Sequence, residues 1–88
     1  WLISGCDGAL SDCGFYTSDF NLSSLEKKSI EIASKVAIIC ESKKFGQQSL
    51  TKFVSTDKVD LLVTDDKLPE KDKENLLEAG VEIVLVGD

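Results

Sequence analysis

The chain contains no histidine and no arginine, so its 10 basic residues are all lysines, and 16 acidic residues outnumber them. The formal net charge at pH 7 is therefore −6. Proteins that bind nucleic acid gather Lys and Arg on one face, where they displace counterions from the phosphates. An acidic chain without arginine offers no such face, which argues against direct binding of DNA or RNA by these 88 residues.

Long apolar stretches are also absent. No apolar run approaches the roughly 20 residues that a helix needs to span a bilayer. No positively charged segment leads into an apolar one ahead of a cleavage site, as a secretory signal would. We therefore expect a cytoplasmic protein that makes no contact with a membrane.

The chain has only three cysteines, an odd number: Cys6, Cys13 and Cys40. Three thiols cannot all pair within one chain, which favours a reducing compartment and free, partly buried thiols. Cys6 and Cys13 stand seven residues apart, and no histidine is available to complete a zinc site. We expect neither a metal nor a cofactor.

Four short aliphatic runs recur along the chain, at residues 1–3, 36–40, 61–63 and 81–86. Strands that are apolar throughout, rather than alternating, are typical of parallel sheets covered on both faces. The segments between the runs are long enough for right-handed crossovers. The sequence predicts one α/β domain, an open and mostly parallel four-stranded Rossmann-like sheet with helices on both faces, in the order βαβαβαβ.

Two segments carry helix signals. Ser23-Ser24-Leu25-Glu26 matches a capping box, which predicts a helix that begins at Ser23. Pro69 and Gly80 mark the start and the end of a second helix. Residues 46–58 offer one or two helical turns, and residues 8–21 are predicted to be an exposed loop that could contact a ligand.

Charged residues gather where the predicted strands end, and open α/β sheets bind their ligands at that edge. The segments concerned are Gly5-Cys6-Asp7-Gly8, Glu41-Ser42-Lys43-Lys44-Phe45-Gly46 and Thr64-Asp65-Asp66. A lysine beside several carboxylates suits a small polyhydroxylated anion. Asp65 and Asp66 could instead attract magnesium, although one dipeptide supplies fewer oxygen ligands than such a cation usually takes.

Each candidate ligand-binding residue also has a structural interpretation. Asp7 could be a turn residue that accepts hydrogen bonds from its own backbone. Glu26 is explained by the capping box, and Lys27 could be a solvated charge on a helix surface. Lys44 could be half of an exposed lysine doublet that nearby carboxylates neutralise.

Taken together, the motifs resemble the effector domain of the DeoR family of bacterial sugar-metabolism repressors. The family pattern is approximately G-x-D-G, D-S-S-K-F-G and I-T-D in this order, and the matching segments are Gly5-Cys6-Asp7-Gly8, Lys27, Glu41-Ser42-Lys43-Lys44-Phe45-Gly46, Val63-Thr64-Asp65-Asp66 and Gly80-Val81-Glu82. The resemblance covers nearly all of the chain. Glu41 stands where the family has its leading aspartate, and Lys43 where it has its second serine.

Members of that family join a winged helix-turn-helix to a domain related to ribose 5-phosphate isomerases, and their effectors are typically phosphorylated sugars. The resemblance implies that residues 1–88 are the C-terminal part of such an effector domain, from a repressor of a sugar-utilisation operon. Operator DNA would be bound only through an N-terminal domain outside this chain. An uncovered sheet edge predicts a homo-oligomer. By this resemblance, Asp7, Glu26, Lys27 and Lys44 are ligand-binding residues, and none is catalytic.

Two other functions remain open at this point. An aldose-ketose isomerase would use Glu26 to move a proton between adjacent carbons, with Asp7 and Lys44 supporting the enediolate. A receiver-like or phosphotransfer domain would use Cys6 as a nucleophile or the Asp65-Asp66 pair as the phosphoacceptor. The acidic pair that receivers carry early in the chain is absent here.

Overall fold

The computed structural model describes residues 1–18 and 27–87. Its strands are β1 (Leu2–Ser4), β2 (Gly8–Leu10), β3 (Gly14–Thr17), β4 (Val36–Ile39), β5 (Thr51–Ser55), β6 (Leu61–Asp65) and β7 (Glu82–Val86). Its helical parts are residues 27–32, the short 3-10 helices η1 (Ser42–Lys44) and η2 (Thr56–Lys58), and α2 (Glu70–Glu78). No helix in the described part of the chain is long and apolar enough to cross a membrane.

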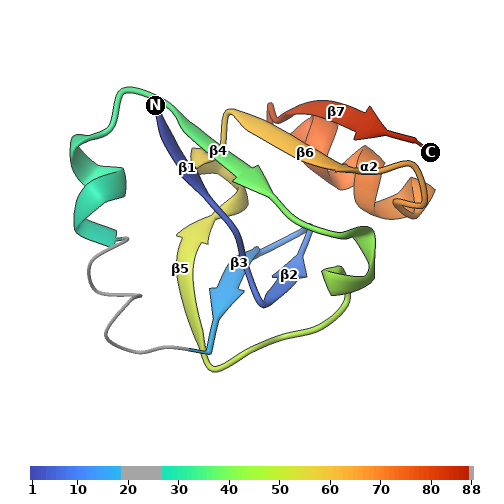
Figure 1. Ribbon diagram of the computed structural model, residues 1–88, viewed down its shortest axis with the longest axis horizontal. Coiled ribbons are helices and arrows are strands. Elements are labelled where there is room, and N and C mark those ends of the chain that lie inside the picture. The colour runs from blue at the N-terminus through green and yellow to red at the C-terminus, as the bar shows by residue number, and fades with distance from the viewer. Residues whose placement is uncertain (19–26, 88) are drawn as a thin grey trace.

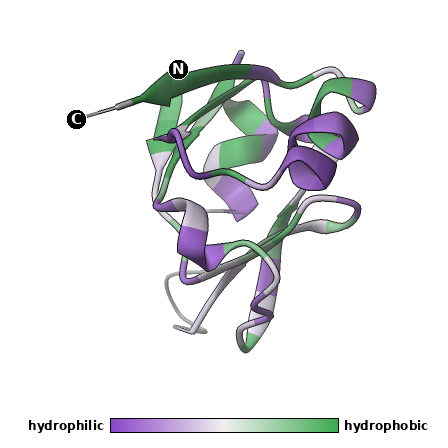
Figure 2. Ribbon diagram, turned by 90° about the vertical axis from the view of Figure 1, so that its right-hand side faces the viewer, coloured by the Kyte–Doolittle hydropathy of each residue, from purple (hydrophilic) through white to green (hydrophobic). Residues whose placement is uncertain are grey.

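The larger sheet contains four parallel strands in the order β1-β4-β6-β7 (Figure 1). Each strand comes from one of the four aliphatic runs, which is why these strands are mostly green in Figure 2. The predicted α/β class and four-stranded parallel sheet are confirmed. Because all four strands run the same way, their carboxyl ends meet at one edge.

The predicted second helix is present as α2. It begins after Pro69 and ends before Gly80, whose φ of 91° lies in the left-handed region that favours glycine. The beginning that was predicted for the first helix, at Ser23, lies outside the described residues.

A second sheet, antiparallel and in the order β2-β3-β5, corrects two predictions. Residues 8–17 are not an exposed loop, because β2 and β3 form a hairpin in which Phe15 and Tyr16 are buried. Within residues 46–58, Thr51–Ser55 form β5 where helical turns were predicted, and the helical part is limited to the short η2 (Thr56–Lys58). The crossover from β4 to β6 therefore contains a strand and two short 3-10 helices instead of an α-helix, so the layout is not βαβαβαβ throughout.

The core lies between the two sheets and α2. Its largest fully buried side chains are Phe15 from β3, Ile38 from β4, Leu62 from β6 and Leu76 from α2. Phe15 also meets the ring of Phe45 edge to face, with ring centroids 6.1 Å apart and planes at 83°. Aromatic packing thus anchors the short hairpin to the segment that follows η1.

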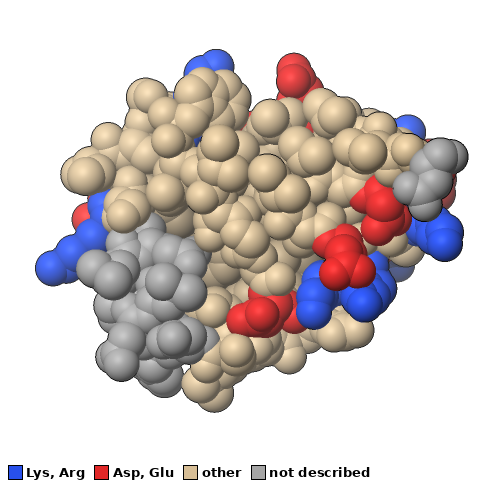
Figure 3. Space-filling view, in the orientation of Figure 1, with Lys and Arg blue, Asp and Glu red and all other residues tan. Residues whose placement is uncertain are grey.

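The opposite face of the parallel sheet is apolar and open in the described part of the chain. Ile3, Ile39 and Val84 are 64%, 51% and 43% exposed, although neighbouring positions on the same strands are buried. Figure 3 shows this side of the molecule with few charged residues over its centre. The parallel strands are mostly aliphatic, as predicted, while the described residues cover only one of their faces.

Replacing Gly14 with alanine is expected to destabilise the fold by about 1 to 3 kcal/mol, because the added Cβ would collide with the backbone carbonyl of Val54 on β5. Urea unfolding measures this change. Gly5→Ala is the matched control, since its Cβ would meet only the Ile39 carbonyl at an ordinary 3.6 Å. Equal stability losses in the two variants would contradict the close approach of β3 and β5.

Candidate functional site

The carboxyl ends of the parallel strands line one cleft of about 520 Å³. Each strand contributes to its wall: Cys6 follows β1, Cys40 and Lys44 follow β4, Thr64 and Asp65 end β6, and Val86 ends β7. This is the edge at which open α/β sheets bind ligands. The cleft combines aliphatic walls with a few polar groups, as small-molecule sites usually do.

Lys44 is held in the wall of this cleft by the segment around it. It is half-buried at the end of η1, and the next residue, Phe45, is buried in the core. The backbone N–H of Gly46 donates a hydrogen bond to the Ala9 carbonyl over 2.8 Å, which ties the segment to β2. The position of Lys44 is therefore set by the core on one side and by a strand on the other.

Lys43, its neighbour, has a different environment. Its ammonium lies 3.3 Å from the Glu41 carboxylate, and both side chains are largely exposed, at 70% and 64%. Exposed pairs of this kind contribute little to stability. The lysine doublet therefore divides into one surface residue and one residue of the cleft.

Asp7 lies between β1 and β2, is exposed, and is not one of the residues that line the cleft; the end of β3 engages its carboxylate. Its Oδ2 accepts hydrogen bonds from the Ser18 backbone N–H at 2.9 Å, the Ser18 hydroxyl at 3.0 Å and the Thr17 hydroxyl at 3.3 Å. The two hydrogen bonds from Ser18 lower the pKa of Asp7, and the positive charge of Lys44 lowers it further. These partners are remote in sequence, so Asp7 is not simply a turn residue bonded to its own backbone.

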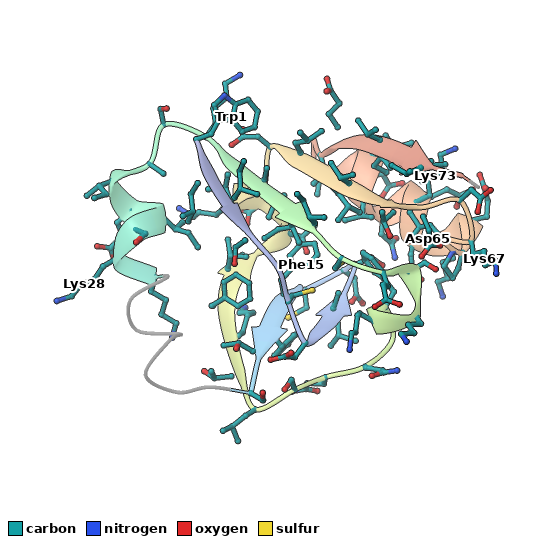
Figure 4. All side chains as sticks on the ribbon, viewed as in Figure 1. Trp1, Phe15, Lys28, Asp65, Lys67 and Lys73 are labelled. Carbon is teal, nitrogen blue, oxygen red and sulfur yellow. The ribbon has the colours of Figure 1, made fainter. Side chains whose placement is uncertain are left out.

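The other two predicted ligand residues are not at this cleft in the described structure. Glu26 lies outside the described residues. Lys27 lies in the helical segment 27–32 and lines a different hollow of about 530 Å³, together with Phe53 of β5. Figure 4 labels its neighbour Lys28 at the opposite end of the molecule from Asp65. Of the predicted ligand residues, the structure therefore places Lys44 in the cleft wall, Asp7 outside the lining but within reach of the Lys44 charge, and Lys27 in a separate hollow.

Thr64 is a polar residue of the cleft wall that the sequence analysis did not single out. It is only 3% exposed, and its Oγ1 has no hydrogen-bond partner among the described residues. An unsatisfied buried hydroxyl costs about 1 to 3 kcal/mol, so such groups need an explanation. The sequence offered one indication that Thr64 could belong to the site, namely its position directly before Asp65 at the end of a predicted strand.

Asp65 organises the backbone around the cleft. Its Oδ2 accepts a hydrogen bond from the Ser42 N–H in η1, and its Oδ1 accepts one from the Lys67 N–H, both over 2.9 Å. The Ser42 side chain and backbone N–H contribute most to lowering the pKa of Asp65, and the Lys67 N–H lowers it further. No group of three or more His, Cys, Asp or Glu residues in segments 1–18 and 27–87 could hold a metal ion.

Because the folded-state pKa values of Asp65 and Asp7 lie below the ordinary value, both carboxylates stabilise the fold most at neutral pH. That contribution is fully present above about pH 5 and is lost as the pH falls through the folded pKa. The urea midpoint should fall on acidification, and Asp65→Asn should show a shallower fall. Asp66→Asn, which removes the same charge one residue away, should keep the wild-type slope. Identical pH profiles for wild type and Asp65→Asn would contradict this role.

The three cysteines are free and half-buried, as predicted from their odd number. Cys6 and Cys40 belong to the cleft, whereas Cys13 lies elsewhere, with its sulfur 3.4 Å from the Tyr16 hydroxyl. The thiol groups are thus divided between two environments.

An open α/β sheet with a cleft at the carboxyl edge of its strands is the architecture in which many small-molecule-binding domains hold their ligands. The family model of the DeoR C-terminal sensor domain matches residues 1–66. The chain belongs to this family, which confirms the resemblance seen in its motifs.

Several curated proteins are similar to the chain over nearly its whole length. A proposed aga operon transcriptional repressor of Escherichia coli O157:H7 is 31% identical over 87 residues, which are 99% of this chain and 32% of that protein. The HTH-type transcriptional regulator GlpR of Haloferax volcanii is 28% identical over 83 residues, covering 94% and 32%. The regulator UlaR of Shigella dysenteriae serotype 1 is 24% identical over 86 residues, covering 98% and 34%. The chain thus spans about a third of the length of these relatives.

Proposed function

We propose that this chain is the effector-sensing part of a DeoR-type repressor of a sugar-utilisation operon, and that the strand-end cleft binds a phosphorylated sugar. The observation that most supports this is the placement of Lys44, which is fixed in the cleft wall with its charge near enough to lower the pKa of Asp7. The names of the relatives, which are transcriptional regulators, support the regulatory part of the proposal.

The chemistry of the cleft suits such a ligand. The Lys44 ammonium would donate charge-assisted hydrogen bonds to a phosphate oxygen or a sugar hydroxyl. The exposed Asp7 carboxylate, outside the cleft lining, would accept from sugar hydroxyls that extend beyond the cleft. Thr64 belongs to the cleft wall, and its buried hydroxyl has no hydrogen-bond partner in the described segments. The aliphatic residues between them would pack against the C–H faces of the ring. Lys27, in its separate hollow, is not part of the proposed site.

Binding would regulate transcription through the rest of the assembly. The edge strands β1 and β7 and the open apolar face favour a homo-oligomer, and operator DNA would be contacted through a separate domain. A ligand shifts the equilibrium between two quaternary arrangements only by its difference in affinity for them. Such coupling between sites is typically about 1 to 3 kcal/mol.

A thermal-shift screen tests the binding proposal. The protein is heated with a panel of phosphorylated pentoses and hexoses, and with the parent sugars and inorganic phosphate as controls. A specific effector at 100 times its dissociation constant should stabilise the fold by about 2.7 kcal/mol. Stabilisation by no member of the panel, or equal stabilisation by a sugar and its phosphate ester, would contradict the proposal.

We further propose that the chain binds without catalysing a reaction, in keeping with relatives that are named as regulators rather than enzymes. Incubation with ribose 5-phosphate, followed by chromatographic detection of ribulose 5-phosphate, separates a sensor from an isomerase. Turnover above the uncatalysed rate would overturn the sensor interpretation.

A further inference from the structure

Two of the three cysteines lie side by side at the ends of neighbouring strands. The pairing of β1 with β4 sets Leu2 opposite Val36 and Ser4 opposite Ile38. Two residues further along each strand, the same register brings Cys6 opposite Cys40. The strands are still adjacent between these points, since a Cβ on Gly5 would lie 3.6 Å from the Ile39 carbonyl oxygen.

The two thiols also face the same way. Both side chains pack against the core, both are half-buried, and both line the cleft. Each thiol is the largest single influence on the pKa of the other, which places the two sulfurs next to each other. Neighbouring strands lie about 4.8 Å apart, and disulfides join residues whose Cα atoms are about 4.4 to 6.8 Å apart. A bond between Cys6 and Cys40 therefore fits the existing backbone.

The surroundings give the two sulfurs different roles. The neighbouring Cys6 lowers the pKa of Cys40, and the Lys44 ammonium lowers it further against the opposing effects of burial, Asp65 and Glu41. The pKa of Cys6 is raised by the neighbouring Cys40 and by burial. Cys40 is thus the better thiolate, and thiolates are the attacking species in disulfide exchange.

We propose that Cys6 and Cys40 form a reversible intrachain disulfide by exchange with a low-molecular-weight disulfide. The Cys40 thiolate attacks one sulfur of the small disulfide and forms a mixed disulfide, while the first small thiolate leaves. Cys6 then loses its proton and attacks the Cys40 sulfur, and the second small thiolate leaves. The protein gives up two thiol protons and two electrons, and the small disulfide becomes two thiols.

This modification would act on the cleft directly, because the new bond ties the end of β1 to the end of β4 in its wall. It does not depend on which ligand the cleft binds. A negative sugar-phosphate screen would therefore not contradict the disulfide proposal. Absence of the disulfide would likewise not contradict the binding of a sugar phosphate.

The test is oxidation of the protein in buffers of oxidised and reduced glutathione, followed by rapid alkylation and peptide mapping by mass spectrometry. The expected product has lost two of three thiols, contains one peptide that links Cys6 to Cys40, keeps Cys13 alkylated, and reverts with dithiothreitol. Cys13→Ser should oxidise like wild type. Cys6→Ser should stop as a glutathione adduct on Cys40, and Cys40→Ser should react about tenfold more slowly at Cys6.

Three results would overturn the proposal: a stable glutathione adduct in wild type without a bridge, a bridge that includes Cys13, or a bridge between two molecules. Exchange by Cys40→Ser as fast as by wild type would overturn the assignment of Cys40 as the attacking thiol. Should a serine variant fail to fold, the peptide map of the wild-type protein alone still decides whether the bridge forms.

Discussion

Replacing Lys44 with glutamine is expected to weaken the binding of a phosphorylated sugar by about 10- to 100-fold. Hydrogen bonds to charged groups contribute about 1.5 to 3 kcal/mol, and each 1.4 kcal/mol is a factor of ten in affinity. The effect should be large because Lys44 is half-buried in the cleft wall and held there by Phe45 and Gly46. Isothermal titration calorimetry with the most stabilising sugar phosphate measures it.

Lys43→Gln is the matched control, since it removes the same charge from the neighbouring position. The Lys43 ammonium is exposed and paired with Glu41 at 3.3 Å, so its loss should change affinity by less than about twofold. Both variants should melt near the wild-type temperature, which shows that folding is intact. Equal losses of affinity in the two variants would indicate that Lys44 acts only through general surface charge. Unchanged affinity in Lys44→Gln would show that Lys44 does not bind the ligand.

Replacing Phe15 with alanine is expected to destabilise the protein by about 3 to 5 kcal/mol, the usual cost of removing a buried aromatic side chain. Phe15 is fully buried, and its ring packs edge to face on Phe45. A domain of 88 residues has only about 4 to 13 kcal/mol of stability in total. Chemical denaturation followed by circular dichroism should show a large fall in the urea midpoint.

The effect should reach the candidate site as well as the fold. Phe45 directly follows Lys44, so loss of its aromatic partner loosens the anchor that holds η1 against the core. Leu50→Ala provides the control, since Leu50 is 66% exposed and its truncation should cost less than about 0.5 kcal/mol. Similar midpoints for the Phe15 and Leu50 variants would contradict the observed packing of the hairpin against the parallel sheet.

The positions of the parallel strands and of α2 could be read from the amino-acid sequence because their signals are local. Each aliphatic run became a strand, and Pro69 and Gly80 flank the second helix. The short motifs at the strand ends were enough to place the chain in its family, which the match over residues 1–66 confirms. Parallel strands share one polarity, so the cleft edge followed from the strand assignment.

The small antiparallel sheet could not be read in this way. It depends on pairing between β3 and β5, where Phe15 meets Val54 across nearly 40 residues of chain. Residues 8–17 contain glycines and polar residues that also favour loops, and only burial against the parallel sheet selects the extended conformation. The local pattern was therefore ambiguous, and long-range packing decided it.

The same division applies to the site. Sequence alone determined the family and predicted a strand-end site that includes Lys44, because both depend on motifs and strand polarity. Only the tertiary structure decided that Lys27 lies apart from Lys44, that Thr64 has a buried hydroxyl in the cleft wall, and that two cysteines 34 residues apart are neighbours. Strand register and helix placement are set by contacts between distant segments, and no local pattern of residues encodes them.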